Sequence, residues 1–270
     1  MATNQMRREA AKRKLERQQE RRAQQTKRRQ RVAIITSAGV AVAVVALVVV
    51  LTNIGAGDDV TLDQAAPPPA PGACTFTPTP DEPASKPAPV PTVTTPVTTG
   101  TAAVRLQTDR GTIPLTLDRA AGPCAVESFL SLTGAGYFNG TPCHRLTTGE
   151  GLKVLQCGDP TGSGTGGPGY TINDEPPTGL SPDPARSGAV IYPRGTVAMA
   201  KTAAPDSGGS QFFLVYADST LPPDYTVFGT IDGEGLTTLD AIAQAGSDDS
   251  NGEGDGRPVA ATTISAATAE

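Results

Sequence analysis

The side chains best suited to chemistry gather in one short segment, where the only histidine of the chain, His144, stands beside Arg145. A lone histidine is more often structural than catalytic, and no Gly-x-Ser-x-Gly pattern supports a Ser-His-Asp nucleophile. A metal site is also disfavoured, because the four cysteines are scattered without a Cys-x-x-Cys pair. We therefore expect neither a metal nor a cofactor.

A glycine-rich stretch at residues 159–169, DPTGSGTGGPG, is a second candidate for ligand chemistry. It lacks the Gly-Lys-Ser/Thr ending of a phosphate-binding loop, and it follows a predicted strand without opening a helix. We interpret it as a structural turn.

The elements that must position these residues lie within residues 101–270, the only stretch able to build a core. Apolar and polar residues alternate around a glycine-containing turn, which predicts a β-hairpin over residues 104–117. Helical spacing of apolar residues predicts helices over 123–135 and 236–245. The other short β runs are 154–156, 195–200, 211–216 and 225–229. Many strands with only two helices predict a mostly β domain, a closed antiparallel barrel with helical ends.

The N-terminal part differs sharply in charge and hydropathy. Residues 1–31 hold 12 Lys or Arg against 3 Asp or Glu, although the whole chain has a net charge of −5. The remainder is therefore acidic and would repel phosphate, which disfavours a nucleic-acid-binding domain. Residues 32–51 form an uncharged run of 20 residues, long enough as a helix to cross a bilayer. The positive-inside rule then predicts a basic cytoplasmic tail (1–31), a transmembrane helix (32–53) and an extracytoplasmic remainder.

Two other interpretations of the apolar run stay open, a buried core helix and a signal peptide cleaved near Ala56-Gly57. The next segment, residues 54–100, is rich in Pro, Thr and Ala. Proline at this density disfavours helices and sheet ladders and favours extended polyproline conformation. We predict a semi-rigid linker; a Pro-rich recognition ligand is the weaker alternative.

Six short motifs then occur in a fixed order. They are CHRL (143–146), LQCGDPTG (155–162), GTGGPGY (164–170), RGTVAMA (194–200), GSQFFL (209–214) and VFG (227–229). Together they resemble the cyclophilin family of peptidyl-prolyl cis-trans isomerases over about residues 102–266, in a membrane-anchored bacterial form of actinobacterial style. The resemblance implies that residues 101–270 form a closed eight-stranded antiparallel barrel capped by two helices.

The resemblance also implies roles for individual residues. Arg145 would be catalytic, because its planar, permanently charged guanidinium can donate to the prolyl nitrogen. Gln156 would bond the substrate backbone and help place the arginine, and Phe213 would form the floor of the proline pocket. The substrate-binding residues that it implies are His144, Val154, Ala200, Lys201, Gln211, Leu221 and Tyr225. Of these, Ala200 and Lys201 would pair with the substrate through their backbone. On composition alone, Phe213, Leu221 and Val154 would be ordinary core residues.

The sequence departs from the family pattern around this pocket. Thr220 or its neighbour stands where cyclosporin-sensitive members have a tryptophan, and the chain contains no Trp. Lys153 replaces an aromatic residue, in a loop that is longer than in common relatives. Tyr225 replaces the second pocket histidine. We therefore expect weak cyclosporin binding.

All four cysteines follow the apolar run, and three pairings are possible. The resemblance puts Cys143 and Cys157 on adjacent strands, which implies a bond between them and leaves Cys74 to pair with Cys124. Free buried thiols are the alternative.

The predicted function is that of a peptidyl-prolyl cis-trans isomerase acting on proline-containing peptides and on unfolded secreted or envelope proteins. The predicted location is the cell membrane, with a single span and the catalytic domain outside the cytoplasm. A non-catalytic peptide-binding chaperone or scaffold on the same fold is the main alternative. A structural envelope protein that uses the barrel only for attachment is a weaker one.

Overall fold

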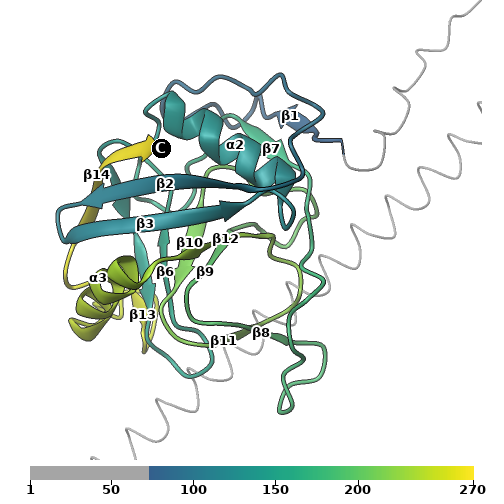
Figure 1. Cartoon of the computed structure of the whole chain (residues 1–270). Helices are drawn as coiled ribbons and strands as arrows, with labels where there is room; N and C mark the ends of the chain where they lie inside the picture. The colour runs from purple at the N-terminus through teal and green to yellow at the C-terminus, as the bar shows by residue number, and fades with distance from the viewer. Residues whose placement is uncertain (1–72) are drawn as a thin grey trace, which may run out of the picture. The chain divides into compact units, whose positions relative to one another are not determined.

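The structure is a computed structural model that describes residues 73–270 (Figure 1). The predicted basic tail, the predicted transmembrane helix and the first part of the predicted linker lie outside these residues. Within residues 73–270, no helix is both long and apolar enough to cross a bilayer.

One antiparallel sheet of ten strands dominates the described part of the chain, in the order β13-β5-β6-β10-β9-β12-β3-β2-β14-β4. Its strands are β2 (Thr101–Thr108), β3 (Gly111–Asp118), β4 (Thr141–Cys143), β5 (Arg145–Thr147), β6 (Val154–Cys157), β9 (Thr196–Met199), β10 (Phe212–Val215), β12 (Val227–Ile231), β13 (Asp255–Gly256) and β14 (Thr262–Ala269). Two small sheets pair β1 (Phe76–Pro78) with β7 (Tyr170–Ile172) and β8 (Val190–Tyr192) with β11 (Ser219–Leu221).

The sheet curls but does not close. Its order begins at β13 and ends at β4, and no ladder in residues 73–270 joins these two strands. The mostly β antiparallel prediction with two helices is confirmed, whereas the closed eight-stranded barrel is wrong in both closure and strand number. The ladder is interrupted at His144, because β4 on one side of it pairs with β14 and β5 on the other side pairs with β6. The short strand β13 adds an edge beyond β5.

The predicted hairpin is present as β2 and β3, which pair along their full length from Thr101↔Asp118 to Thr108↔Gly111. The hydroxyl of Thr108 organises the turn, since it accepts a hydrogen bond from Arg110 N at 3.0 Å and donates one to Gly111 O at 2.6 Å. Gly111 adopts a φ of 135°, and a Cβ there would lie 2.9 Å from Thr238 Oγ1. Only glycine fits this position.

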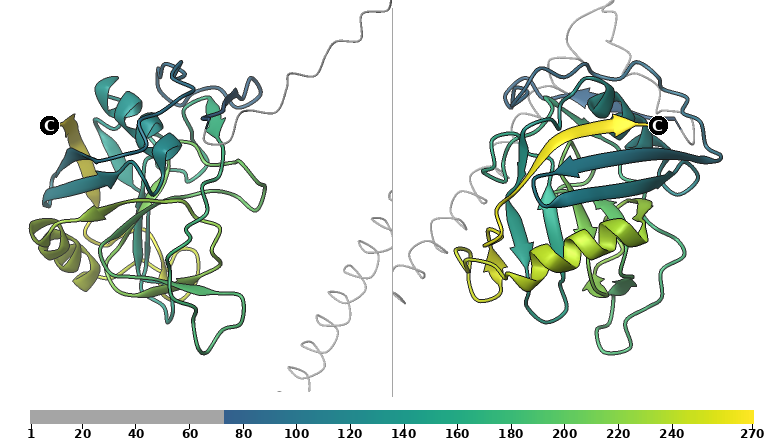
Figure 2. Two further views of the ribbon diagram at one scale, coloured as in Figure 1. Left: turned by 45° about the vertical axis from the view of Figure 1, so that its right-hand side comes forward. Right: turned by 60° about the vertical axis from the view of Figure 1, so that its left-hand side comes forward.

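Helices α2 (Pro123–Gly134) and α3 (Gly233–Gln244) lie at opposite ends of the curled sheet (Figures 1 and 2). Proline in the first turn suits α2, because the first N–H groups of a helix have no partner within it. No side chain at the N-cap satisfies these donors. The carboxylate of Glu175 does so instead, accepting from Cys124 N at 2.9 Å and from Ala125 N at 3.0 Å.

The two apolar clusters of the domain follow from the alternation of side chains along its strands. In β10, Phe212 and Leu214 belong to the main core beside Phe129 and Phe138, whereas Phe213 belongs to a second apolar cluster. Successive strand residues point to opposite faces of the sheet. One strand thus supplies both the main core and, on its other face, an aromatic residue of the second apolar cluster.

The described end of the predicted linker is attached to the domain. β1 pairs with β7, and Cys74 is bonded to Cys124 at the start of α2. Further along, Ser85 N donates to Gly167 O at 2.9 Å. This segment therefore braces the end of the glycine-rich stretch.

Candidate active site

Three predicted catalytic residues stand in one row across neighbouring strands. Arg145 on β5 is paired with Gln156 on β6, and Gln156 is paired with Phe213 on β10. Paired residues share a face of the sheet. Arg145 and Phe213 are two strands apart, about 10 Å at the usual strand spacing. The sheet therefore places a guanidinium and an aromatic ring on either side of one glutamine.

Hydrogen bonds extend this row into a network. Arg145 Nη1 donates to Gln156 Oε1 at 3.3 Å, and Gln156 Nε2 donates to Gln211 Oε1 at 2.9 Å. Gln211 Nε2 then donates to the carbonyls of Gly164 and Gly166, each at 3.0 Å. The glycine-rich stretch is thereby tied to the arginine through two amide side chains.

The glycine-rich stretch is a turn built around one carboxylate. Asp159 is fully buried and accepts hydrogen bonds from the backbone of Thr161, Gly164 and Gly166 at 2.8, 2.7 and 3.1 Å. Burial alone would raise the pKa of Asp159, but these bonds and the Thr161 hydroxyl hold it at about 2. The donors that a phosphate would need are thus already used, in agreement with a structural turn.

Sequence reasoning missed one partner of the arginine, Asp255 on β13. Arg145 Nε donates to Asp255 Oδ1 at 2.8 Å, and Arg145 Nη2 donates to Asp255 Oδ2 at 2.6 Å. The hydrogen bond to Asp255 raises the pKa of Arg145 further above its ordinary value, and the same bond lowers the pKa of Asp255. The two residues are 110 positions apart, so no local spacing could have indicated the pair.

The predicted apolar pocket residues Val154, Phe213, Leu221 and Tyr225 do gather, in the second cluster. The Phe213 side of this cluster is well packed, with the Phe213 and Tyr225 rings 5.7 Å apart edge to face. Tyr192 lies behind them and donates its hydroxyl to the carbonyl of Tyr225 at 3.2 Å. Phe213 retains 5% of its surface exposed, while Leu221 and Tyr225 are half-buried.

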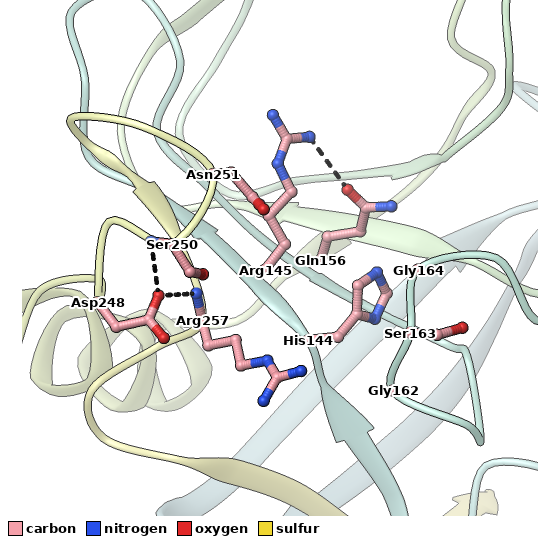
Figure 3. Close-up of a pocket in the computed structure, with 10 residues that line it drawn as sticks. All are labelled: His144, Arg145, Gln156, Gly162, Ser163, Gly164, Asp248, Ser250, Asn251 and Arg257. Carbon is pink, nitrogen blue, oxygen red and sulfur yellow. Dashed lines mark hydrogen bonds between the residues drawn. The ribbon is translucent and has the colours of Figure 1, made fainter.

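A polar cavity of about 490 Å³ adjoins the arginine (Figure 3). Its lining residues are His144, Arg145, Gln156, Gly162, Ser163, Gly164, Asp248, Ser250, Asn251 and Arg257. The apolar cluster does not contribute to this lining. The site therefore has an apolar part and a separate polar part, with Arg145 and Gln156 in the latter.

His144 lies against the turn, with its ring beside Gly164 (Figure 3). Neither ring nitrogen has a hydrogen-bond partner within the described residues. Burial lowers the pKa of His144 below its ordinary value, opposed by the charge of Asp159. His144 therefore lines the cavity with both of its ring nitrogens buried.

The residues still to be placed differ in whether they contact the hydrogen-bond network of the site. Ala200 donates its N–H to Gln211 O at 2.9 Å, which places it beside the amide network. The side chain of Lys201 turns away to Asp174, with Nζ 2.5 Å from Oδ2. Lys153, at the rebuilt loop, donates its ammonium group to the carbonyl of Thr148. Neither lysine side chain joins the row formed by Arg145 and Phe213.

Both predicted disulfide bonds are confirmed. Cys143 is bonded to Cys157, and Cys74 to Cys124, with Cα atoms 4.0 and 5.2 Å apart. The first bond directly precedes His144 and Arg145 on one side and directly follows Gln156 on the other. It therefore links the two segments that carry the polar side chains of the site.

The chain is similar in sequence to known proteins. The sequence model of the family described as cyclophilin type peptidyl-prolyl cis-trans isomerase/CLD matches residues 103–269. A probable peptidyl-prolyl cis-trans isomerase B of Mycobacterium leprae is 49% identical over 193 residues, which cover 71% of this chain and 64% of that protein. A peptidyl-prolyl cis-trans isomerase of Helicobacter pylori is 40% identical over 146 residues, which cover 53% of this chain and 82% of that protein.

Among solved structures, a cyclophilin type peptidyl-prolyl cis-trans isomerase of Cryptosporidium parvum is 29% identical, with a TM-score of 0.49, and the match covers 63% of this chain and 98% of that chain. The chain spans a little under two thirds of the mycobacterial relative. The family model, in contrast, covers well over half of this chain. The chain therefore belongs to the family of cyclophilin-type peptidyl-prolyl cis-trans isomerases.

Proposed function

We propose that this protein accelerates rotation about X–Pro peptide bonds. The observation that carries the proposal is the row of Arg145, Gln156 and Phe213 across three adjacent strands. An apolar floor for a pyrrolidine ring and a guanidinium for the adjoining amide are the two groups that the reaction needs.

The chemistry requires no bond to break. The barrier of about 18–20 kcal/mol comes from the partial double bond of the amide, although the two X–Pro isomers differ by only about 1 kcal/mol. When the amide twists, the prolyl nitrogen regains its lone pair and becomes a better hydrogen-bond acceptor. Arg145 stabilises this twisted state, because its N–H donors are held in place before the substrate arrives. Gln156 keeps the guanidinium in the row and the Phe213 cluster receives the ring.

We further propose that the domain works outside the cytoplasm, anchored by residues 32–53, on proline-containing segments of unfolded secreted or envelope proteins. Two observations support this proposal. Both disulfide bonds fit an oxidising compartment, and the basic segment precedes the apolar run in the sequence.

The direct test measures isomerisation of a proline-containing peptide by the full chain in a protease-coupled assay, with Arg145→Ala as the variant. We expect kcat/KM to fall by about 100-fold to 1,000-fold, as when a preorganised donor is removed from a reacting group. Circular dichroism checks that the variant is folded. Peptide binding without turnover by the unmodified chain would overturn the proposal and favour a non-catalytic chaperone.

A further inference from the structure

Only some of the N–H donors of the Arg145 guanidinium are hydrogen-bonded to other protein groups. A guanidinium has five N–H groups in a rigid planar fork. Nε and one N–H of Nη2 bind the two oxygens of Asp255, and one N–H of Nη1 binds Gln156. Within residues 73–270, one N–H on each terminal nitrogen therefore has no partner. The Asp255 carboxylate thus takes one edge of the fork and leaves donors on the other edge for a substrate.

Asp255 is itself held firmly. β13 pairs with β5, so Asp255 lies opposite Thr147 on the strand that carries Arg145. Asn251 Nδ2 donates to Asp255 Oδ1 at 3.2 Å, and the Asp255 N–H donates to Gly252 O at 2.9 Å. The adjacent Gly256 admits no side chain, since a Cβ there would lie 2.2 Å from Asp248 Oδ1. The turn that presents the carboxylate is therefore tightly packed.

A second arginine shows what an ordinary surface pair with a two-donor contact to a carboxylate looks like, although it uses the other edge of its guanidinium. Arg194 also binds a carboxylate with two donors, Nη1 and Nη2 to Asp240 at 2.7 and 2.8 Å. Its partner Asp240 lies on α3 and is 55% exposed. Neither residue lines the cavity. Asp255 is only 29% exposed, and its partner lines the cavity. An arginine that donates twice to one carboxylate thus occurs on the exposed surface and again at Arg145.

We propose that Asp255 is a positioning residue for catalysis, which fixes the plane of the Arg145 guanidinium so that its free donors meet the prolyl nitrogen. The inference rests on the proposed isomerase function. Without the carboxylate, Gln156 would hold the fork through a single bond of 3.3 Å, and the guanidinium could rotate out of the row. Misplacement of a catalytic group by a fraction of its contact distance is enough to slow a reaction.

The test compares Asp255→Asn with Asp240→Asn in the full chain, using NMR exchange spectroscopy on a proline-containing peptide to separate kcat from peptide affinity. We expect Asp255→Asn to lower kcat about tenfold while peptide affinity changes less than about twofold. Asp255→Glu should recover part of the loss, and Asp240→Asn should match the unmodified chain. As a second readout, hydrogen exchange of the Arg145 Nε–H should become faster in Asp255→Asn.

The outcomes separate this inference from the proposed function. If the unmodified chain is inactive, or if Arg145→Ala keeps its activity, the proposed function fails. If the unmodified chain is active and Arg145→Ala is not, then an unchanged or higher kcat in Asp255→Asn overturns the positioning role alone. An equal loss in Asp240→Asn also overturns it, because the effect would then be that of any lost ion pair.

Discussion

The two walls of the site are built in different ways. The apolar wall, defined as Val154, Phe213, Leu221 and Tyr225, is continuous with a packed cluster. The polar wall, defined as Arg145, Gln156, Gln211 and Asp255, is held by hydrogen bonds between partly exposed side chains. Burial stabilises a fold, whereas partly exposed ion pairs contribute little to stability. Changes in the apolar wall should therefore cost stability and binding, and changes in the polar wall should cost turnover.

The largest effect on stability should come from Phe213→Ala. Phe213 is nearly buried against Tyr192 and Tyr225, so its truncation should lower the free energy of unfolding by about 3–5 kcal/mol. Denaturant unfolding measures this loss.

Two milder substitutions on β10 separate the effect on packing from the effect on peptide binding. Phe213→Leu and Phe212→Leu remove similar volume from the same strand, but Phe212 faces the main core. Both should be destabilised, whereas only Phe213→Leu should raise the KM for a proline-containing peptide. Equal KM values for the two variants would argue against the apolar wall as the proline pocket.

The two disulfide bonds provide the next test of the difference between the two walls. They close loops of 14 and 50 residues, for which the chain-entropy model gives about 3 and about 4 kcal/mol. Replacing Cys74 and Cys124 by serine should therefore cost slightly more stability than replacing Cys143 and Cys157. Only the loss of the Cys143–Cys157 bond should also lower kcat/KM, because it flanks the polar wall. Unfolding curves and kinetics on both double variants provide the check.

Gln211→Ala should give a smaller effect. It removes the bonds from Gln156 and to Gly164 and Gly166, so kcat should fall several-fold, in line with about 1 kcal/mol for a hydrogen bond. The free energy of unfolding should change by less than about 1 kcal/mol. A loss of stability as large as that of Phe213→Ala would contradict the distinction between the two walls.

The smallest effect concerns pH. Because burial lowers the pKa of His144, the unfolded chain takes up a proton first as the pH falls below about 6.5. Stability should therefore decline from this pH downward, and His144→Gln should remove that part of the decline. An NMR titration of this single histidine gives its pKa directly, and a value at or above 6.5 would contradict the expectation.

Much of the apolar wall could be predicted from sequence. Strand alternation in 211–216 puts Phe212 and Phe213 on opposite faces, and the ordered motifs identify which face carries the site. The hairpin and both helices were predicted from the spacing of apolar residues, whereas both disulfide pairs were implied by the family resemblance.

The polar wall could be predicted only in part. Arg145 and Gln156 belong to the motifs, but Asp255 comes from a turn 110 residues away with no motif of its own. Likewise, the sequence did not reveal that Lys201 pairs with Asp174 or that the ladder breaks at His144. Each of these depends on contacts between distant segments, which spacing along the chain does not encode.

The central claim is that a planar, directed guanidinium lowers the barrier to amide rotation. Arg145→Lys tests it most directly, because lysine keeps the positive charge and loses the fork. NMR exchange spectroscopy on a proline-containing peptide should show kcat lowered about 100-fold with peptide affinity within about threefold of the unmodified chain. A lysine variant that retains at least half of the original kcat would contradict the account.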